Sequence, residues 1–91
     1  MITVEVLIAG RVQGVGFRAC IKRIADSLII TGEVMNLADG RVRVIATTED
    51  VILEKFVSML YGCPRAIIRE VRLNEVDARA FTEFAVRKGL F

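Results

Sequence analysis

Three glycines and an arginine fall within nine residues in the segment GRVQGVGFR, at positions 10–18. Because glycine lacks a Cβ atom, the backbone amides around it can turn toward one point without steric conflict. Amides arranged in this way at the start of a helix bind anions, phosphate above all. Arg18 would add two parallel N–H donors to phosphate oxygens. The types and spacing of these residues therefore predict a phosphate-binding loop.

The spacing of this loop differs from that of the common nucleotide-binding motifs. It lacks the Gly-Lys-Ser/Thr ending of a Walker A motif, and its G-x-x-x-G-x-G pattern is not the dinucleotide fingerprint. From the spacing alone, a purely structural interpretation stays open. In that interpretation the loop is a tight strand-to-helix connection and Arg18 is solvated.

The chain contains no histidine, which restricts the chemistry that it can perform. Ser-His-Asp and Cys-His mechanisms, phosphohistidine chemistry and His-ligated zinc sites are all excluded. Any catalysis must use carboxylates, arginine, lysine, side-chain amides or the backbone. We expect no metal site and no cofactor.

Both cysteines of the chain, Cys20 and Cys63, are expected to be free thiols. Two cysteines without a Cys-x-x-Cys motif are compatible with a reducing compartment, so we expect a cytoplasmic protein. Cys20 falls on an apolar helical stripe and is expected to pack in the core. Cys63 lies in a Gly-Cys-Pro turn and is expected to be partly exposed.

The overall composition indicates one small domain, residues 1–91, of which 54% are apolar and only one is proline. The formal net charge of +2 is too small to predict nucleic-acid binding. No apolar run approaches the length of a membrane-spanning helix, and the segment MITVEVLIAG resembles a strand more than a signal peptide. We therefore expect a monomer that binds neither nucleic acid nor a membrane.

The periodicity of the apolar residues predicts the elements that must position the loop. Strands are expected at 3–9, 30–37, 41–47, 66–75 and 82–87, a helix from Phe17 to Leu28, and a second helix between Thr48 and Gly62. The order β-α-β-β-α-β, followed here by a short fifth strand, is typical of an α+β ferredoxin-like sandwich. In that fold an antiparallel sheet carries both helices on one face.

Local signals support these boundaries. Asp39-Gly40 predicts a hairpin turn between the second and third strands. Thr48 is expected to cap the second helix with its hydroxyl group. The buried stripe of that helix is expected to consist of Ile52, Phe56, Met59 and Leu60.

Four segments of the chain resemble the acylphosphatase family, in the family's order and nearly end to end. They are GRVQGVGFR at 10–18, GEVMNLADGRVRV at 32–44, GCPRAIIREV at 62–71 and FAVR at 84–87. The resemblance implies a ferredoxin-like enzyme that hydrolyses small-molecule acyl phosphates to a carboxylate and inorganic phosphate, without metal.

The resemblance also implies roles for particular residues. Arg18 would bind the substrate phosphate, and Asn36 would position the attacking water. The remaining phosphate-binding residues would be Gln13, Gly14, Val15, Gly16 and Phe17. From its residue type alone, a role of Asn36 in the hairpin turn is favoured, and only the resemblance reverses this preference. Met35 and Glu33 stand where the family often has an arginine and an aromatic residue, which leaves the substrate preference open.

Three alternative functions follow from the same fold. A non-catalytic module could bind phosphate or a phosphorylated metabolite without turning it over. An RNA-recognition domain would need stacking aromatics on its central strands, and the segments TVEVLIA and RVRVIAT have none. Acylphosphatase-like domains also occur within larger carbamoyl-transfer maturation proteins.

Five further basic residues allow two interpretations. They are either simply solvated or draw anionic substrates to the protein: Arg11, Lys22, Arg23, Arg41 and Arg43.

Overall fold

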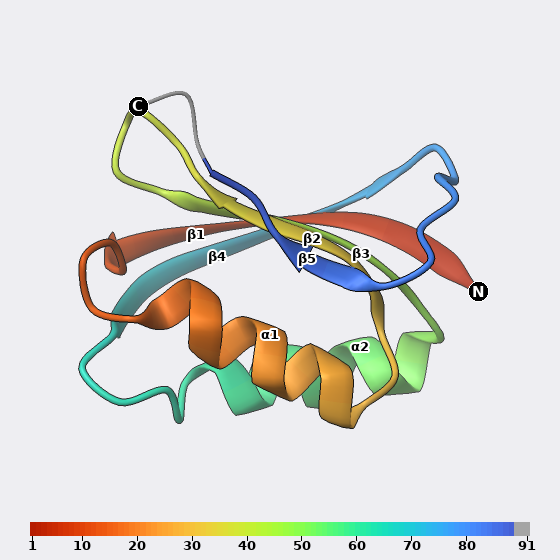
Figure 1. Ribbon diagram of the computed structural model, residues 1–91, viewed down its shortest axis with the longest axis horizontal. Coiled ribbons are helices and arrows are strands. Elements are labelled where there is room, and N and C mark those ends of the chain that lie inside the picture. The colour runs from red at the N-terminus through yellow and green to blue at the C-terminus, as the bar shows by residue number, and fades with distance from the viewer. Residues whose placement is uncertain (89–91) are drawn as a thin grey trace.

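A computed structural model describes residues 1–88 as a five-stranded sheet with two helices packed on one face (Figure 1). The elements are β1 (Ile2–Arg11), α1 (Phe17–Ser27), β2 (Thr31–Asn36), β3 (Val42–Thr48), α2 (Asp50–Leu60), β4 (Ile67–Val76) and β5 (Phe84–Val86). The predicted order and the α+β ferredoxin-like class are confirmed. No helix within residues 1–88 is both long enough and apolar enough to cross a membrane.

The sheet has the strand order β4-β1-β3-β2-β5 and is mixed. The first four strands pair antiparallel, as predicted, but β5 pairs parallel to β2. The prediction of a wholly antiparallel sheet was therefore wrong for this strand. The reason is topological: β4 runs opposite to β2, and residues 77–83 return the chain from the end where β4 finishes. The strand that follows must then run in the direction of β2.

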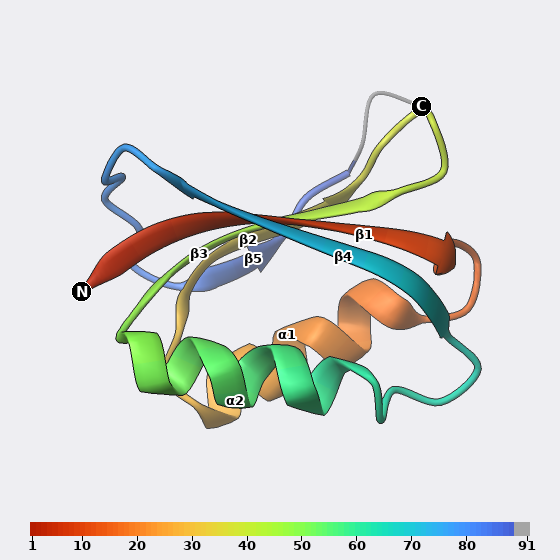
Figure 2. The same ribbon diagram turned by 180° about the vertical axis from the view of Figure 1, so that it is seen from behind.

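The core lies between the sheet and the two helices, which cover the same face in both views (Figures 1 and 2). Alternate residues of β1 point into it, and they are Val4, Val6 and Ile8. From the helices, Phe17, Ile21 and Phe56 are at most 2% exposed. The rings of Phe56 and Phe84 lie 6.5 Å apart, so the short strand β5 is also anchored in this core.

Two predicted details at α2 differ from the structure. Thr48 is not a helix cap: it is the last residue of β3, where it pairs with Ile2 of β1, and Glu49 precedes the helix instead. Ladder pairing with a central strand thus fixes the Thr48 backbone before the helix can begin. Met59 was predicted to be buried but is 38% exposed. The helix turns Phe56 and Leu60 into the core, which leaves Met59 at the edge of the apolar stripe.

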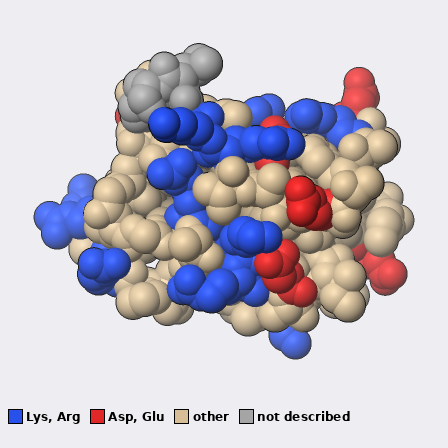
Figure 3. Space-filling model, viewed as in Figure 1, with Lys and Arg blue, Asp and Glu red and all other residues tan. Residues whose placement is uncertain are grey.

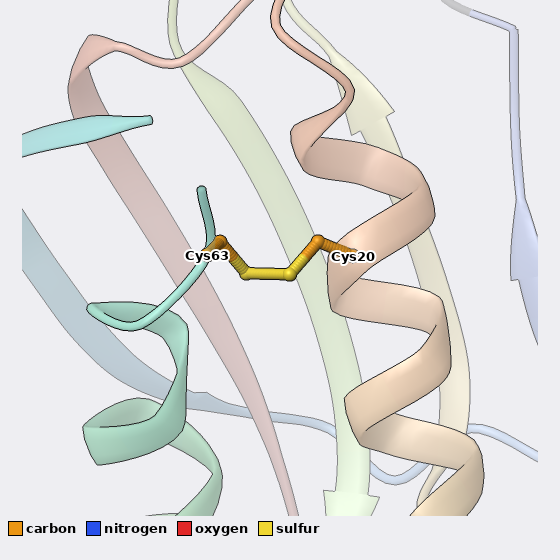
Figure 4. Close-up of a disulfide and its surroundings, with 2 residues drawn as sticks. All are labelled: Cys20 and Cys63. Carbon is orange, nitrogen blue, oxygen red and sulfur yellow. A yellow bond between two sulfur atoms is a disulfide. The ribbon is translucent and has the colours of Figure 1, made fainter. Parts of the chain in front are cut away.

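Cys20 and Cys63 form a disulfide, so the prediction of two free thiols was wrong (Figure 4). Cys20 belongs to α1 and Cys63 follows α2, and the two Cα atoms lie 6.0 Å apart. Both residues are buried, including Cys63, for which partial exposure was expected. The pairing arises because the two helices lie side by side on the sheet and bring together positions 43 residues apart.

Candidate functional site

The loop from β1 to α1 begins at a β-bulge. The register of β1 against β4 shifts between Ala9 and Gly10. Gly10 has a φ of 139°, and a Cβ atom at this position would collide with the carbonyl oxygen of Ile67. Glycine therefore lets β4 approach β1 closely at the point where the chain leaves the sheet toward the helix.

Gly16 ends the loop and begins the helix. Its φ of 77° and ψ of 17° lie in the left-handed region, which glycine adopts without strain. Its carbonyl accepts a hydrogen bond from the backbone N–H of Cys20 at 3.2 Å. Within residues 1–88 no side chain caps α1, and its first turn carries no acidic residue. The backbone N–H groups of this turn can therefore bind an anion.

A pocket of about 230 Å³ adjoins this helix start. It brings together five residues that the sequence analysis assigned to the site, one of them from β2, and adds three that it did not. The lining residues are Val12, Gly14, Gly16, Phe17, Arg18, Ala19, Asn36 and Val86. Backbone amides of the loop, one guanidinium and one side-chain amide thus border the same small volume.

Arg18 lies in the first turn of α1, and its side chain contacts the residue that follows β5. Its Nη1 donates a hydrogen bond to the carbonyl oxygen of Arg87 at 3.2 Å. The backbone N–H of Arg87 in turn donates to Val34 of β2 at 2.8 Å, and its Nε donates to Glu33 at 3.2 Å. Glu33 thus fixes the end of β5 on which Arg18 rests. Basic side chains gather over α1 and β5 on this face (Figure 3).

Asn36 is the last residue of β2, where it pairs with Val42 of β3. Its Oδ1 atom is buried and has no hydrogen-bond partner within residues 1–88. A buried amide oxygen without a partner is uncommon, because losing its hydrogen bond to water destabilises the fold. The side chain lines the pocket, so a water molecule or a ligand there would be close to it.

Gln13 and Val15 were predicted to contact phosphate, but neither lines the pocket. The Gln13 side-chain amide donates to the carbonyl oxygens of Leu37 and Arg41, at 2.8 and 3.0 Å. It therefore ties the loop to the β2–β3 hairpin, which carries Asn36. Val15 is half-buried and packs against the core.

The turn of that hairpin is stabilised by Asp39. The backbone N–H of Arg41 donates to Asp39 at 3.0 Å, and the Arg41 Nε donates to its other carboxylate oxygen at 2.9 Å. These contacts, the backbone bond first, hold the pKa of the Asp39 carboxyl below its usual value. Together, Gln13 and Asp39 set where the end of β2 stands relative to the loop.

The pocket residues that the sequence analysis missed are Val12, Ala19 and Val86. Val12 lies within the segment GRVQGVGFR and Ala19 directly follows it, so extending the set of predicted site residues by one position at each end would have found both. Val86 carries no local signal, because only the pairing of β5 with β2 brings it to the pocket.

The remaining basic residues are mostly engaged elsewhere. Arg43 pairs with Glu5 at 2.7 Å, Arg41 with Asp39, and Lys22 with Asp26 at 3.0 Å. Their charges are thus partly neutralised by local partners. Within residues 1–88 no group of three or more His, Cys, Asp or Glu residues is arranged to hold a metal ion.

Comparisons with known proteins agree with this fold. The Acylphosphatase family model matches residues 4–86. An acylphosphatase of Archaeoglobus fulgidus is 41% identical over 87 residues, covering 94% of this chain and 98% of the relative. The crystal structure of acylphosphatase from Bacillus subtilis superposes with a TM-score of 0.91 at 29% identity, covering 96% of this chain and 99% of the other.

A similar fold is also found within a much larger protein. The crystal structure of full-length HypF, in a phosphate- and nucleotide-bound form, matches with a TM-score of 0.88 at 26% identity. The match covers 98% of this chain but 12% of that one. The family match, by contrast, spans most of the residues described above. The chain therefore belongs to the acylphosphatase family.

Proposed function

We propose that this protein hydrolyses acyl phosphates, with Arg18 and the amides of the loop binding the phosphate and Asn36 holding the attacking water. The observation that carries the proposal is that one pocket joins an uncapped helix start, the Arg18 side chain and the Asn36 amide. Family membership supports the reaction class. A monomer suffices for this chemistry, because every lining residue comes from one chain.

The reaction suits a site that has no histidine. Water attacks phosphorus, the bond from phosphorus to the bridging oxygen breaks, and the electron pair leaves with the carboxylate. A carboxylate is a good leaving group and needs no general acid. Phosphoryl transfer depends mainly on positioning and on stabilising the charge of the equatorial oxygens. Amide donors and a guanidinium supply that stabilisation.

Asn36 acts by position and not as a base. Its Oδ1 can accept a hydrogen bond from water and hold it in line with the bond that breaks, but an amide does not take up a proton. The proton released by the water goes to a phosphate oxygen of the substrate. The products are then a carboxylate and dihydrogen phosphate, which equilibrates with solvent. A bound water would also satisfy the buried Oδ1 atom.

The test is the turnover of benzoyl phosphate, followed by absorbance with a chelator present. We expect Arg18→Ala to lose both phosphate binding and turnover, and Asn36→Ala to lose turnover while still binding phosphate. Each loss should be on the order of 100- to 1,000-fold in rate. Arg72→Ala is the matched control, because Arg72 lies on β4 and pairs with Glu70 at 3.3 Å, away from the pocket.

Inorganic phosphate binding, measured by calorimetry, distinguishes the alternative function. A wild-type protein that binds phosphate with Arg18-dependent affinity but never hydrolyses benzoyl phosphate would be a phosphate-binding module, and the hydrolase proposal would fail. An unchanged rate in Asn36→Ala would reject the water-holding role of that residue.

A further inference from the structure

Arg65 has a backbone conformation that its residue type does not explain. It lies in the connection between α2 and β4, directly after Pro64, and has a φ of 67°. Residues with a Cβ atom seldom adopt this left-handed conformation, and glycine would adopt it without strain. Such strain persists where the surrounding structure enforces it, and it is concentrated at functional sites.

The guanidinium of Arg65 lies against the phosphate-binding loop. A Cβ atom placed on Gly16 would be 3.3 Å from Nη2 of Arg65, and Gly16 itself lines the pocket. The loop and the connection after α2 lie side by side at the same end of the molecule in both views (Figures 1 and 2). Within residues 1–88, Arg65 makes no ion pair, so no carboxylate described here neutralises its charge.

The disulfide fixes the segment that carries Arg65. Cys63 precedes Arg65 by two residues, and its partner Cys20 lies one turn into α1, the helix whose start borders the pocket (Figure 4). The bond therefore links the segment that carries Arg65 to the helix that begins at the loop. It limits the distance between the backbone of Arg65 and the loop. The strained backbone and the covalent tie are two independent features of the segment that carries this cation.

We propose that Arg65 is a second cationic group that attracts the phosphate of the substrate. Arg18 lines the pocket, whereas Arg65 lies outside it, on the other side of Gly16. This inference rests on the proposed function and adds to it a residue that determines affinity. The guanidinium attracts the dianion through space across the rim formed by Gly16. Its attraction acts equally on the bound substrate and on the transition state, so it lowers KM and leaves kcat unchanged.

The experiment compares wild type with Arg65→Gln, which keeps much of the side-chain length and removes the charge. We expect KM for benzoyl phosphate and Kd for inorganic phosphate to rise about three- to tenfold at low ionic strength, as expected for one charge near a dianion in a largely aqueous setting. Both ratios should shrink as sodium chloride is added. Arg65→Lys should recover most of the affinity, and kcat should stay at the wild-type value in both variants.

Arg72→Gln controls for net charge, because it removes the same charge from the face of the sheet opposite to the helices. Equal KM and Kd values in wild type and Arg65→Gln would overturn the inference, as would a loss confined to kcat. Thermal unfolding of each variant identifies any loss that comes from misfolding. If wild type fails to turn over benzoyl phosphate, the hydrolase proposal fails, while the phosphate Kd still decides the role of Arg65.

Discussion

Replacing Asn36 by leucine should abolish activity without lowering the stability of the protein. The Oδ1 atom is buried without a hydrogen-bond partner within residues 1–88. No group in this part of the chain therefore loses a hydrogen bond to this oxygen when Asn36 is replaced, and leucine has a similar shape. Asn36→Leu should keep the free energy of unfolding within about 1 kcal/mol of the wild-type value. Turnover should fall on the order of 100- to 1,000-fold, as for loss of a preorganised polar group.

Gln13→Leu provides the matched control at the same end of the molecule. It makes the same kind of change from amide to leucine, but the Gln13 amide donates two hydrogen bonds to backbone carbonyls. Its loss removes both of these hydrogen bonds, each of which contributes about 0.5–1.5 kcal/mol, so the free energy of unfolding should fall by about 1–3 kcal/mol. Of the two variants, only Gln13→Leu is thus expected to lose stability.

Urea denaturation followed by far-UV circular dichroism measures both stabilities, and benzoyl phosphate hydrolysis measures activity. If Asn36→Leu loses as much stability as Gln13→Leu, the Asn36 amide serves the hairpin and not the pocket. If Asn36→Leu keeps both the stability and the rate of wild type, the buried oxygen has no part in catalysis. Either result would refute the reasoning that links the unsatisfied atom to the reaction.

Two further predictions concern stability alone. The disulfide closes a loop of 43 residues, for which the chain-entropy relation gives about 4 kcal/mol, so Cys20→Ala/Cys63→Ala should lose about that much in urea denaturation. Dithiothreitol reduces the bond to two thiols and is itself oxidised to a cyclic disulfide. It should lower the urea midpoint of the wild type and leave that of the double variant unchanged. Two titratable thiols in the purified native protein would contradict the pairing. Ile29 follows α1 with a φ of 57° and is 87% exposed. Because the left-handed conformation costs a residue with a Cβ atom about 1–2 kcal/mol, Ile29→Gly should raise the unfolding midpoint, and a lower midpoint would show that the exposed side chain stabilises the fold.

Local sequence patterns were sufficient to predict most of the fold. The alternation of Val4, Val6 and Ile8 and the helical spacing of Phe17 and Ile21 are properties of neighbouring residues, and each element lies close to its predicted position. The glycines of the loop were also informative, because a positive φ at Gly16 is a backbone requirement that the residue type reveals.

The features that the sequence did not reveal depend on contacts between distant segments. The Cys20–Cys63 bond requires α1 and α2 to lie side by side, and nothing near either cysteine indicates this. The same holds for the side chain of Gln13, which bonds to the hairpin and not to the pocket. The predicted meeting of Arg18 and Asn36 at one site came from the family resemblance, since the spacing alone left both residues open to structural roles.

The position of β5 has a consequence for the order in which the site is assembled. Within residues 1–88 this strand pairs only with β2, more than fifty residues earlier. It supplies Val86 of the pocket, and Arg87 directly after it supplies the carbonyl oxygen that accepts from Arg18. During synthesis on the ribosome, the first four strands and both helices emerge before residues 84–87 do. Phosphate affinity should therefore be acquired late, after the hydrophobic core has begun to form, and its appearance would report the pairing of β5 with β2.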